Sequence, residues 1–222
     1  MRVVLIDYGA GNLHSVEKAL LAAGVPVLRS ADPGVARESD ALVLPGQGHF
    51  GQVMRSFERS GFAPVVAEHI AHGRPFLGIC IGLQLLTRGS EEAPGVAGLS
   101  VLDAEVRRFP AEGVSVPQMG WNQIWPLGAS PLLDGVAAGA FVYFANSYYV
   151  TFPAGSVPMG AETRYGTTRF LSAVSLGGLH ATQFHPEKSQ AVGLRVLENF
   201  GALVRSAAGA TPARATPARA TP

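Results

Sequence analysis

The first 90 residues alternate short hydrophobic runs with amphipathic stretches. Apolar runs that end in turn-forming residues predict β-strands at residues 3–7, about 26–29, 41–44 and 75–79. Apolar side chains at helical spacing predict helices at about 12–23, 52–72 (with a break near Gly61 and Pro64) and 81–87. Strands and helices that alternate through short turns indicate parallel pairing with right-handed crossovers.

After about residue 95 the pattern changes to strand-like segments separated by Gly- or Pro-bearing turns. These segments are 99–109, 141–150, 170–176 and 180–184. Hairpins and a mixed sheet fit this region better than further parallel units. A last amphipathic helix is predicted over about 191–205. The pattern therefore predicts one α/β domain over residues 1–206, with three layers and a mixed, largely parallel central sheet flanked by helices.

The C-terminal end has a different texture. A five-residue unit, TPARA, repeats from about residue 210, with no large apolar residue and a proline in every repeat. Such a segment cannot bury enough surface to offset its ordering entropy. We expect residues 207–222 to form a disordered tail without a catalytic role.

Composition narrows the class of protein. The 222 residues are 47% hydrophobic with a mean hydropathy of +0.22, which excludes wholesale disorder. The 17 basic and 16 acidic residues balance too closely to indicate a nucleic-acid surface. No apolar run reaches membrane-spanning length, and the N-terminus does not resemble a signal peptide. The single cysteine excludes an internal disulfide and fits a reducing cytoplasm, so we expect a cytoplasmic protein.

That cysteine, Cys80, lies in the sequence Gly78-Ile79-Cys80-Ile81-Gly82, between a predicted strand and a predicted helix. The pattern is the thiol version of the nucleophile elbow, in which a strained turn exposes the nucleophile. The glycines allow neighbouring segments to close in, and the following helix N-terminus favours a thiolate. The alternative is an ordinary buried core cysteine.

A thiolate nucleophile needs a base, and His185 is the favoured candidate among six histidines. Pro186 keeps the chain extended at His185. In an extended segment residues two apart point the same way, so Glu187 could orient the imidazole as the acid of a catalytic triad does. The alternative is a histidine at a strand end beside a solvated glutamate.

The other histidines suggest surface roles. His14 lies early in a predicted helix, and His180 begins a predicted strand, so both are expected to be exposed. His69 and His72 lie three residues apart on a predicted helix. They lack a convincing third ligand, so we expect a solvated helix face rather than a metal site.

Acyl transfer also needs donors for an oxyanion. The turn Pro45-Gly46-Gln47-Gly48 ends a predicted parallel strand and could expose backbone N–H groups of Gly46 and Gln47. The N–H of Ile81, directly after the nucleophile, would be another donor. The alternative is an ordinary glycine-rich turn, since neither a dinucleotide fingerprint nor a phosphate loop is present.

Six motifs in order resemble those of the class I (triad) glutamine amidotransferases. The resemblance runs from Met1 to about Arg205. Cysteine and His-Pro-Glu elements are shared across this family, whereas the N-terminal and MGWN motifs are similar to those of the glutaminase subunits of imidazole glycerol phosphate synthase. The motifs are IDYGAGNLHSV at 6–16, LPGQGHFG at 44–51, LGICIGLQLL at 77–86, PQMGWN at 117–122, YFANSYYV at 143–150 and ATQFHPEKS at 181–189.

The resemblance implies roles by position. Cys80 would attack the amide carbon of glutamine, His185 would transfer protons, and Glu187 would orient His185. The implied oxyanion hole is formed or flanked by Gly46, Gln47 and Ile81. The residues implied to contact glutamine are Gly48, Gln84, Ser147 and Tyr148. No metal and no organic cofactor is expected.

Two residues depart from the family pattern. At Gln47 the family usually has a small or β-branched residue, which leaves backbone donation intact. At Asn146 the family more often has histidine, so we assign Asn146 no acid or base role.

The resemblance also implies a partner. Ammonia released into neutral water would mostly become ammonium, so the product must pass to a second site by a dry route. The implied partner is a (β/α)8 cyclase subunit, in a heterodimer that forms imidazole glycerol phosphate and an aminoimidazole carboxamide ribotide. Candidate contact residues are Asn12, His49, Met119, Trp121 and Lys188.

Three other functions remain open at this stage. Another triad amidotransferase, of the anthranilate synthase or guanylate synthase type, would have a different partner. A non-catalytic regulator on the same scaffold would not need the triad. A free-standing cysteine hydrolase would be fully active without any partner.

Overall fold

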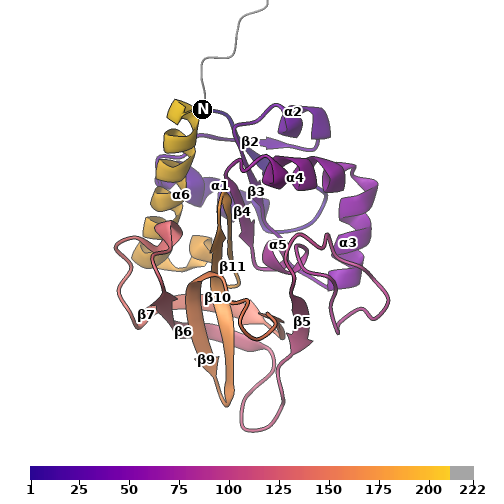
Figure 1. Cartoon of the computed structure of the whole chain (residues 1–222), viewed down its shortest axis with the longest axis vertical. Helices are drawn as coiled ribbons and strands as arrows, with labels where there is room; N and C mark the ends of the chain where they lie inside the picture. The colour runs from indigo at the N-terminus through magenta and orange to yellow at the C-terminus, as the bar shows by residue number, and fades with distance from the viewer. Residues whose placement is uncertain (211–222) are drawn as a thin grey trace, which may run out of the picture.

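The computed structural model describes residues 1–210 (Figure 1). Residues 211–222, which hold most of the TPARA repeats, lie outside the described residues, so the expected disorder of the tail remains a prediction. The described chain forms a nine-stranded sheet in the order β2-β1-β3-β4-β11-β10-β9-β6-β7 and a separate two-stranded sheet, β5-β8.

One half of the large sheet is parallel. Every pair of neighbours from β2 to β11 runs in the same direction. Four of these strands come from the N-terminal region, as their apolar runs predict, and the fifth is the last strand of the chain. The strands are β1 (Val3–Ile6), β2 (Val27–Ser30), β3 (Ala41–Leu44), β4 (Phe76–Ile79) and β11 (Leu179–Thr182).

The other half of the sheet is antiparallel, as the turn-rich second half of the sequence predicts. It extends the parallel half beyond β11, so the sheet is mixed. Its strands are β6 (Gln118–Leu127), β7 (Ala140–Asn146), β9 (Met159–Tyr165) and β10 (Thr168–Leu176). The small sheet pairs β5 (Glu105–Arg108) with β8 (Tyr148–Thr151).

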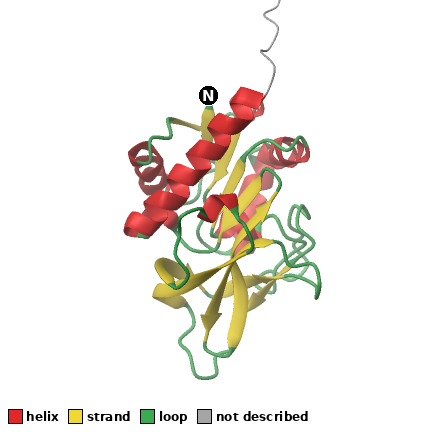
Figure 2. Ribbon diagram, turned by 60° about the vertical axis from the view of Figure 1, so that its left-hand side comes forward, coloured by secondary structure: helices red, strands yellow, loops and turns green. Residues whose placement is uncertain are grey.

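Helices cover both faces of the parallel half, which gives the expected three layers (Figure 2). Alternate residues of a strand point to opposite faces. On one face Val4 and Ile6 of β1 pack with α3 (Phe50–Arg59) and α4 (Phe62–Ala71). On the other, the remaining β1 residues pack with α1 (Leu13–Ala22) and the long α6 (Gln190–Ala210).

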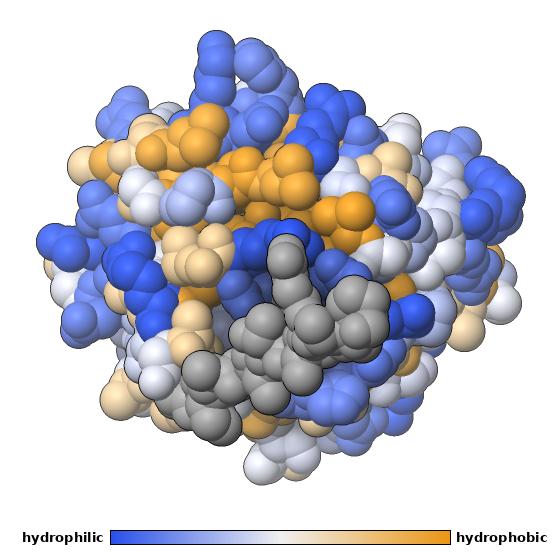
Figure 3. All heavy atoms as spheres, turned by 90° about the horizontal axis from the view of Figure 1, so that it is seen from above, coloured by the Kyte–Doolittle hydropathy of each residue, from blue (hydrophilic) through white to orange (hydrophobic). Residues whose placement is uncertain are grey.

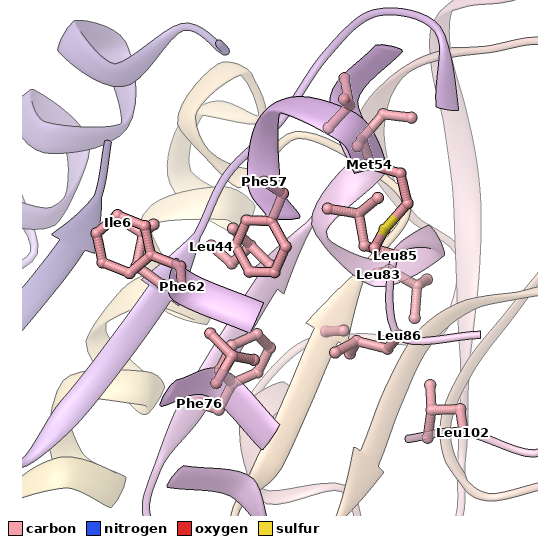
Figure 4. Packing of buried hydrophobic residues seen from close by; sticks show 14 of the residues in the cluster. Ile6, Leu44, Met54, Phe57, Phe62, Phe76, Leu83, Leu85, Leu86 and Leu102 are labelled. Atoms are coloured by element: carbon pink, nitrogen blue, oxygen red, sulfur yellow. The ribbon is translucent and has the colours of Figure 1, made fainter. Parts of the chain in front are cut away.

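Aromatic rings fill the layer beneath α3 and α4 (Figure 4). Phe57 and Phe62 stack with centroids 6.5 Å apart, and both are fully buried. Phe76 of β4 lies in the same cluster, with Leu83 and Leu85 from the segment after Cys80. Burial of a large apolar side chain contributes roughly 1.5–3 kcal/mol, so this packing anchors the segment that follows Cys80.

The structure departs from the predicted elements in several places. A short helix, α2 (Pro33–Arg37), was not predicted, although Asp32 caps it by accepting a hydrogen bond from the backbone N–H of Gly34. The predicted strand 99–109 is strand only over Glu105–Arg108, because Leu99 and Leu102 bond back to residues after Cys80. Strands β6 and β9 were also missed, since glycine and polar residues interrupt their patterns.

Helix α6 runs to Ala210, five residues beyond the predicted end at Arg205, so the first residues of the predicted tail are helical. The end of the molecule with the chain's N-terminus shows a band of hydrophobic residues among hydrophilic ones (Figure 3). The parallel strands begin at this end, and their carboxyl ends point away from it (Figure 1). Within residues 1–210, no helix combines the length and apolarity needed to cross a membrane.

Candidate active site

Cys80 occupies the sharp turn between β4 and the short helix α5 (Ile81–Gln84). Its backbone has φ 53° and ψ −106°, a left-handed conformation that a residue with a side chain rarely adopts. The Cys80 N–H donates to the carbonyl oxygen of Thr182 at 2.7 Å, which ties the turn to the neighbouring strand β11. The predicted elbow is therefore present, and its strain presents the thiol at the carboxyl end of a parallel strand.

Both flanking glycines are sterically required. A Cβ atom at Gly78 would lie 2.9 Å from the backbone of Gly82, and a Cβ atom at Gly82 would overlap the carbonyl oxygen of Leu44. The elbow therefore packs closely against strand β3 on one side and against the turn at Gly82 on the other. Core packing of a cysteine alone would not demand this pair of glycines.

His185, distant from Cys80 in the sequence, lies close enough for the two side chains to interact electrostatically. Its Nδ1 bonds Glu187 Oε1 at 2.8 Å, and the side chains are 7% and 1% exposed. Burial lowers the pKa of His185, but the charge and hydrogen bond of Cys80, with Glu187, outweigh burial and raise it from 6.5 to about 10. The imidazole is therefore held as a cation between a carboxylate and the sulfur.

The charge of His185 contributes more to the electrostatic environment of the Cys80 sulfur than helix α5 does. The predicted helix over 81–87 shrinks to the four residues of α5, and the rest of that segment forms turns. So short a helix has only a small dipole. The imidazolium of His185, rather than a long helix, is the main positive charge near the Cys80 sulfur.

The Gly46–Gly48 turn lies against the elbow. A Cβ atom at Gly46 would lie 2.5 Å from the Tyr8 hydroxyl and 3.0 Å from Ile81 Cγ2. Tyr8 donates to the carbonyl oxygen of Pro45 at 3.0 Å, and burial, followed by the charge of Cys80, raises the pKa of its phenol. Tyr8 thus supports the turn from below as a neutral donor, a role that sequence reasoning missed although the residue lies in the N-terminal motif.

A cavity of about 220 Å³ opens above the sulfur. Its walls bring together residues from four distant parts of the chain. The lining residues are Gln47, Gly48, Cys80, Ile81, Gln84, Glu92, Pro117, Met119, Ala145, Asn146, Ser147 and Tyr148. Of the ten catalytic, oxyanion and substrate-binding residues predicted from the sequence, only Gly46, His185 and Glu187 are outside this lining.

A break between two strands builds one wall of the cavity. The predicted strand 141–150 is in fact two strands, β7 in the large sheet and β8 in the small one. Ser147 lies at the break, and its carbonyl oxygen accepts from the N–H of Phe109 at 3.0 Å. The chain changes sheets here, which turns Asn146, Ser147 and Tyr148 toward the cavity.

Sequence reasoning also missed Gln183, whose Nε2 lies 3.6 Å from Cys80 Sγ. Gln183 is fully buried and bonds Gln84. The available signal was its position two residues before His185, since residues two apart on an extended chain share a face.

Two histidine expectations are wrong. His69 is fully buried and donates through Nε2 to the carbonyl oxygen of Pro75 at 3.0 Å, rather than lying on a solvated helix face. His180 is also buried and bonds Ser175 at 3.0 Å. Burial lowers the pKa of each to about 4. Among residues 1–210, no three metal-binding side chains come together.

Exposed hydrophobic side chains lie on β6 and β7, and one of them, Met119, also lines the cavity. Met119, Trp121 and Phe141 are 69%, 46% and 53% exposed. Trp121 contacts the ring of Tyr143 edge to face at 6.1 Å, and Lys188 Nζ lies 5.5 Å from the centroid of the same ring. Met119, Trp121 and Phe141 are therefore surface side chains of β6 and β7 rather than core packing.

Comparison with known families gives one consistent result. Residues 4–203 match the family model described as glutamine amidotransferase class-I. The imidazole glycerol phosphate synthase subunit HisH of Deinococcus radiodurans is 52% identical over 201 residues, which cover 89% of this chain and 92% of that protein. The HisH subunit of Aquifex aeolicus is 50% identical over 201 residues, covering 90% and 96%.

Solved structures share the fold at lower identity. A glutamine amidotransferase crystal structure superposes with a TM-score of 0.70 at 20% identity, covering 91% of this chain and 98% of that chain. The glutaminase domain of Trypanosoma brucei CTPS, solved with bound acivicin, has a TM-score of 0.67 at 16% identity, covering 93% and 94%. The α/β architecture is therefore that of known glutaminase domains.

Proposed function

Because the chain belongs to the class I glutamine amidotransferases, among the HisH subunits of imidazole glycerol phosphate synthase, we propose that Cys80, His185 and Glu187 hydrolyse glutamine to glutamate and ammonia. The observation that carries this proposal is the contact of a strained, single cysteine with a buried His–Glu pair beside a cavity. The wider role is the supply of ammonia for histidine biosynthesis.

The first half of the reaction forms a thioester. The Cys80 thiolate attacks the side-chain amide carbon, and the carbonyl oxygen becomes an oxyanion. The backbone N–H groups of Gln47 and Ile81 are suited to stabilise it, because Ile81 opens helix α5 and has no intrahelical partner for its N–H. His185 then gives its proton to the departing nitrogen, so the C–N bond breaks and ammonia leaves.

The second half regenerates the enzyme. Water attacks the thioester while neutral His185 takes one of its protons, and the C–S bond breaks to give glutamate and the thiolate. Glu187 keeps Nδ1 of His185 occupied throughout, so that Nε2 faces the reacting atoms. Two proton transfers through one nitrogen complete the cycle.

Residues of the cavity wall bind glutamine. Gln84 donates to the carbonyl oxygen of Tyr148 at 3.2 Å, and both residues line the cavity with Gly48 and Ser147. Polar backbone and side-chain atoms at this wall suit the α-ammonium and α-carboxylate groups of an amino acid. The Gly46–Gly48 turn would close over the amide end.

The partner is a cyclase subunit that consumes the ammonia and forms imidazole glycerol phosphate and an aminoimidazole carboxamide ribotide. Its docking surface is the rim of β6 and β7, where Met119 and Trp121 are exposed next to the cavity mouth. Aromatic and methionine side chains are enriched at interface centres. Asn12, His49 and Lys188 belong to the same proposed interface. We place the reaction in the cytoplasm, where a reducing environment keeps the lone thiol of Cys80 reduced.

A labelling experiment tests the proposal. A diazo-ketone analogue of glutamine is added to the complex with the cyclase subunit, and the adduct is mapped by mass spectrometry. We expect one adduct, on Cys80, and loss of glutamine hydrolysis. Hydrolysis that persists in the Cys80→Ser complex would instead favour a non-catalytic role for this chain.

The partner identifies the pathway. Co-purification with a cyclase supports the proposed role, whereas co-purification with an anthranilate or guanylate synthase subunit would favour another triad amidotransferase. Full glutaminase activity of the isolated chain would favour a free-standing hydrolase. The comparison requires hydrolysis rates with and without the liganded cyclase subunit.

A further inference from the structure

Gln183 forms a hydrogen bond with the nucleophile from a fully buried position. Its Nε2 lies 3.6 Å from Cys80 Sγ, and none of its surface is exposed. It follows β11 directly, and its backbone N–H donates to the carbonyl oxygen of Ser172 at 2.8 Å on β10. Both its main chain and its side chain are therefore fixed, so the amide has one orientation toward the sulfur.

The backbone carbonyl of Tyr148, at the other end of the same hydrogen-bond network, determines which group of Gln183 faces the sulfur. The carbonyl oxygen of Tyr148 can only accept, and it faces Gln84 Nε2 at 3.2 Å. The same Nε2 donates to Gln183 Oε1 at 3.0 Å. Because its oxygen is held by Gln84, Gln183 must present its NH₂ group to the sulfur.

The same chain of amides fixes the acceptor that Gln84 offers to the cavity. Both Nε2 hydrogens of Gln84 are used, one on Tyr148 and one on Gln183. Its Oε1 is therefore the atom left to bind a ligand, and Gln84 lines the cavity. A carbonyl oxygen suits an ammonium group, so one amide network joins the ammonium-binding wall to the nucleophile.

We propose that Gln183 is a catalytic residue, because it stabilises the Cys80 thiolate by donating a hydrogen bond to it. Gln84 holds the side-chain oxygen of Gln183 and thereby sets the direction of that hydrogen bond. A thiolate is a stronger acceptor than a thiol, so a buried donor favours the charged form. Gln183 has no exposed surface, so water does not compete for its amide. The sulfur thus has a donor on the side of Gln183 as well as the imidazolium of His185. The proposal rests on the proposed function, since it concerns the same nucleophile.

The single cysteine permits a direct test on the whole chain. Iodoacetamide alkylates only the thiolate, which displaces iodide to form a thioether, and no other thiol reacts. The variant Gln183→Met keeps an unbranched chain of similar length but removes the donor. We expect the pH of half-maximal alkylation to rise by about one unit, a tenfold change in the thiol–thiolate equilibrium.

Two further variants make the test specific. Ser172→Ala removes a buried hydrogen bond on the neighbouring strand, 3.2 Å long to Ala161, without touching the sulfur, and its midpoint should match the wild type. Gln84→Met leaves Gln183 in place but removes the atom that orients it, so its midpoint should rise by less than that of Gln183→Met. If Gln183→Met fails to fold, the alkylation midpoint of Gln84→Met tests the proposal: a rise above the wild-type value supports it, and the wild-type value overturns it.

Equal midpoints for the wild type and the Gln183 variant would overturn the proposal, and so would an equal shift in Ser172→Ala. In the complex with the cyclase subunit, Gln183→Met should lower kcat for glutamine hydrolysis about tenfold. A wild-type complex that fails to hydrolyse glutamine, but whose alkylation midpoint still depends on Gln183, would refute the proposed function and leave the sulfur contact standing.

Discussion

Glu187 holds His185 by a single 2.8 Å hydrogen bond between Oε1 and Nδ1, and both side chains are almost completely buried. His185 is the extended N-cap residue of a short 3-10 helix, Pro186–Lys188, and Glu187 lies within that helix beside its imidazole. The bond leaves Nε2 of His185 for the sulfur. Burial of both partners makes the pair strong and also makes the loss of either one costly.

Replacing His185 should therefore impair catalysis more than replacing Glu187. We expect His185→Gln to lower kcat for glutamine hydrolysis by about 10³-fold, because the proton donor and acceptor is lost. Glu187→Gln should cost roughly tenfold to hundredfold, since an orienting acid is partly dispensable. The measurement is glutamine hydrolysis in the complex with the cyclase subunit. The control is His72→Gln, which replaces an exposed histidine and should leave kcat unchanged.

The result would contradict the assigned roles if Glu187→Gln were as damaging as His185→Gln. It would also do so if neither substitution changed kcat by more than a few-fold. Circular dichroism of each variant separates lost chemistry from lost folding.

Two buried histidines should make the protein sensitive to mild acid. His69 and His180 have pKa values of about 4 in the folded state, lowered by burial from 6.5. Between pH 6.5 and 4 the unfolded chain binds protons that the folded chain excludes. Stability is then complete above about pH 6.5 and declines as pH falls, by up to about 1.4 kcal/mol per pH unit for each histidine.

Urea unfolding at pH 7 and pH 5 measures this decline. His69→Gln should flatten the pH dependence, because the glutamine cannot take up a proton, even where it lowers stability at pH 7. The matched control is His72→Gln, which should keep the wild-type slope. Identical slopes for the wild type and His69→Gln would show that His69 does not contribute.

The close contact of Gly46 with Tyr8 predicts a coupled pair of substitutions. A Cβ atom at Gly46 would lie 2.5 Å from the Tyr8 hydroxyl, so Gly46→Ala must displace the turn that we propose donates to the oxyanion. We expect about a 10²-fold loss of glutamine hydrolysis, comparable to the loss of one oxyanion donor. In a Tyr8→Phe background the added cost of Gly46→Ala should be smaller, because the clashing oxygen is gone.

Gly209→Ala provides the control for this pair. Gly209 lies on helix α6 with open space around it, so alanine there should leave hydrolysis unchanged. Strict additivity of the Gly46 and Tyr8 substitutions would mean that the hydroxyl does not hold the turn in place.

The rim of β6 and β7 should bind the cyclase subunit. Trp121→Ala removes a large, 46% exposed side chain on β6, two residues after the cavity residue Met119, and should raise the Kd of the complex at least tenfold. Titration calorimetry measures the change. Leu28→Ala, an equally exposed hydrophobic residue on β2 at the far edge of the sheet order, should not weaken binding. The opposite result would place the interface elsewhere.

Local features of this protein could be predicted from its sequence. The Gly78-x-Cys80-x-Gly82 pattern predicts an elbow, because strain and close approach are properties of a few consecutive residues, and the structure has that elbow. The short apolar runs predict the parallel strands, because a strand buried on both faces needs continuous apolar residues. The predicted hydrogen bond between His185 and Glu187 is present, although Glu187 lies in a short 3-10 helix (Pro186–Lys188) rather than in the extended segment that the sequence indicated.

Relationships between distant segments were decided only by the tertiary structure. Nothing in residues 141–150 marks the change of sheet at Ser147, because the partner strands of β7 and β8 lie elsewhere in the chain. The burial of His69 and the amide network from Tyr148 to Gln183 likewise depend on packing between elements. Sequence patterns report local conformation and hydrophobicity, whereas a buried hydrogen bond also requires a partner that only folding brings within reach.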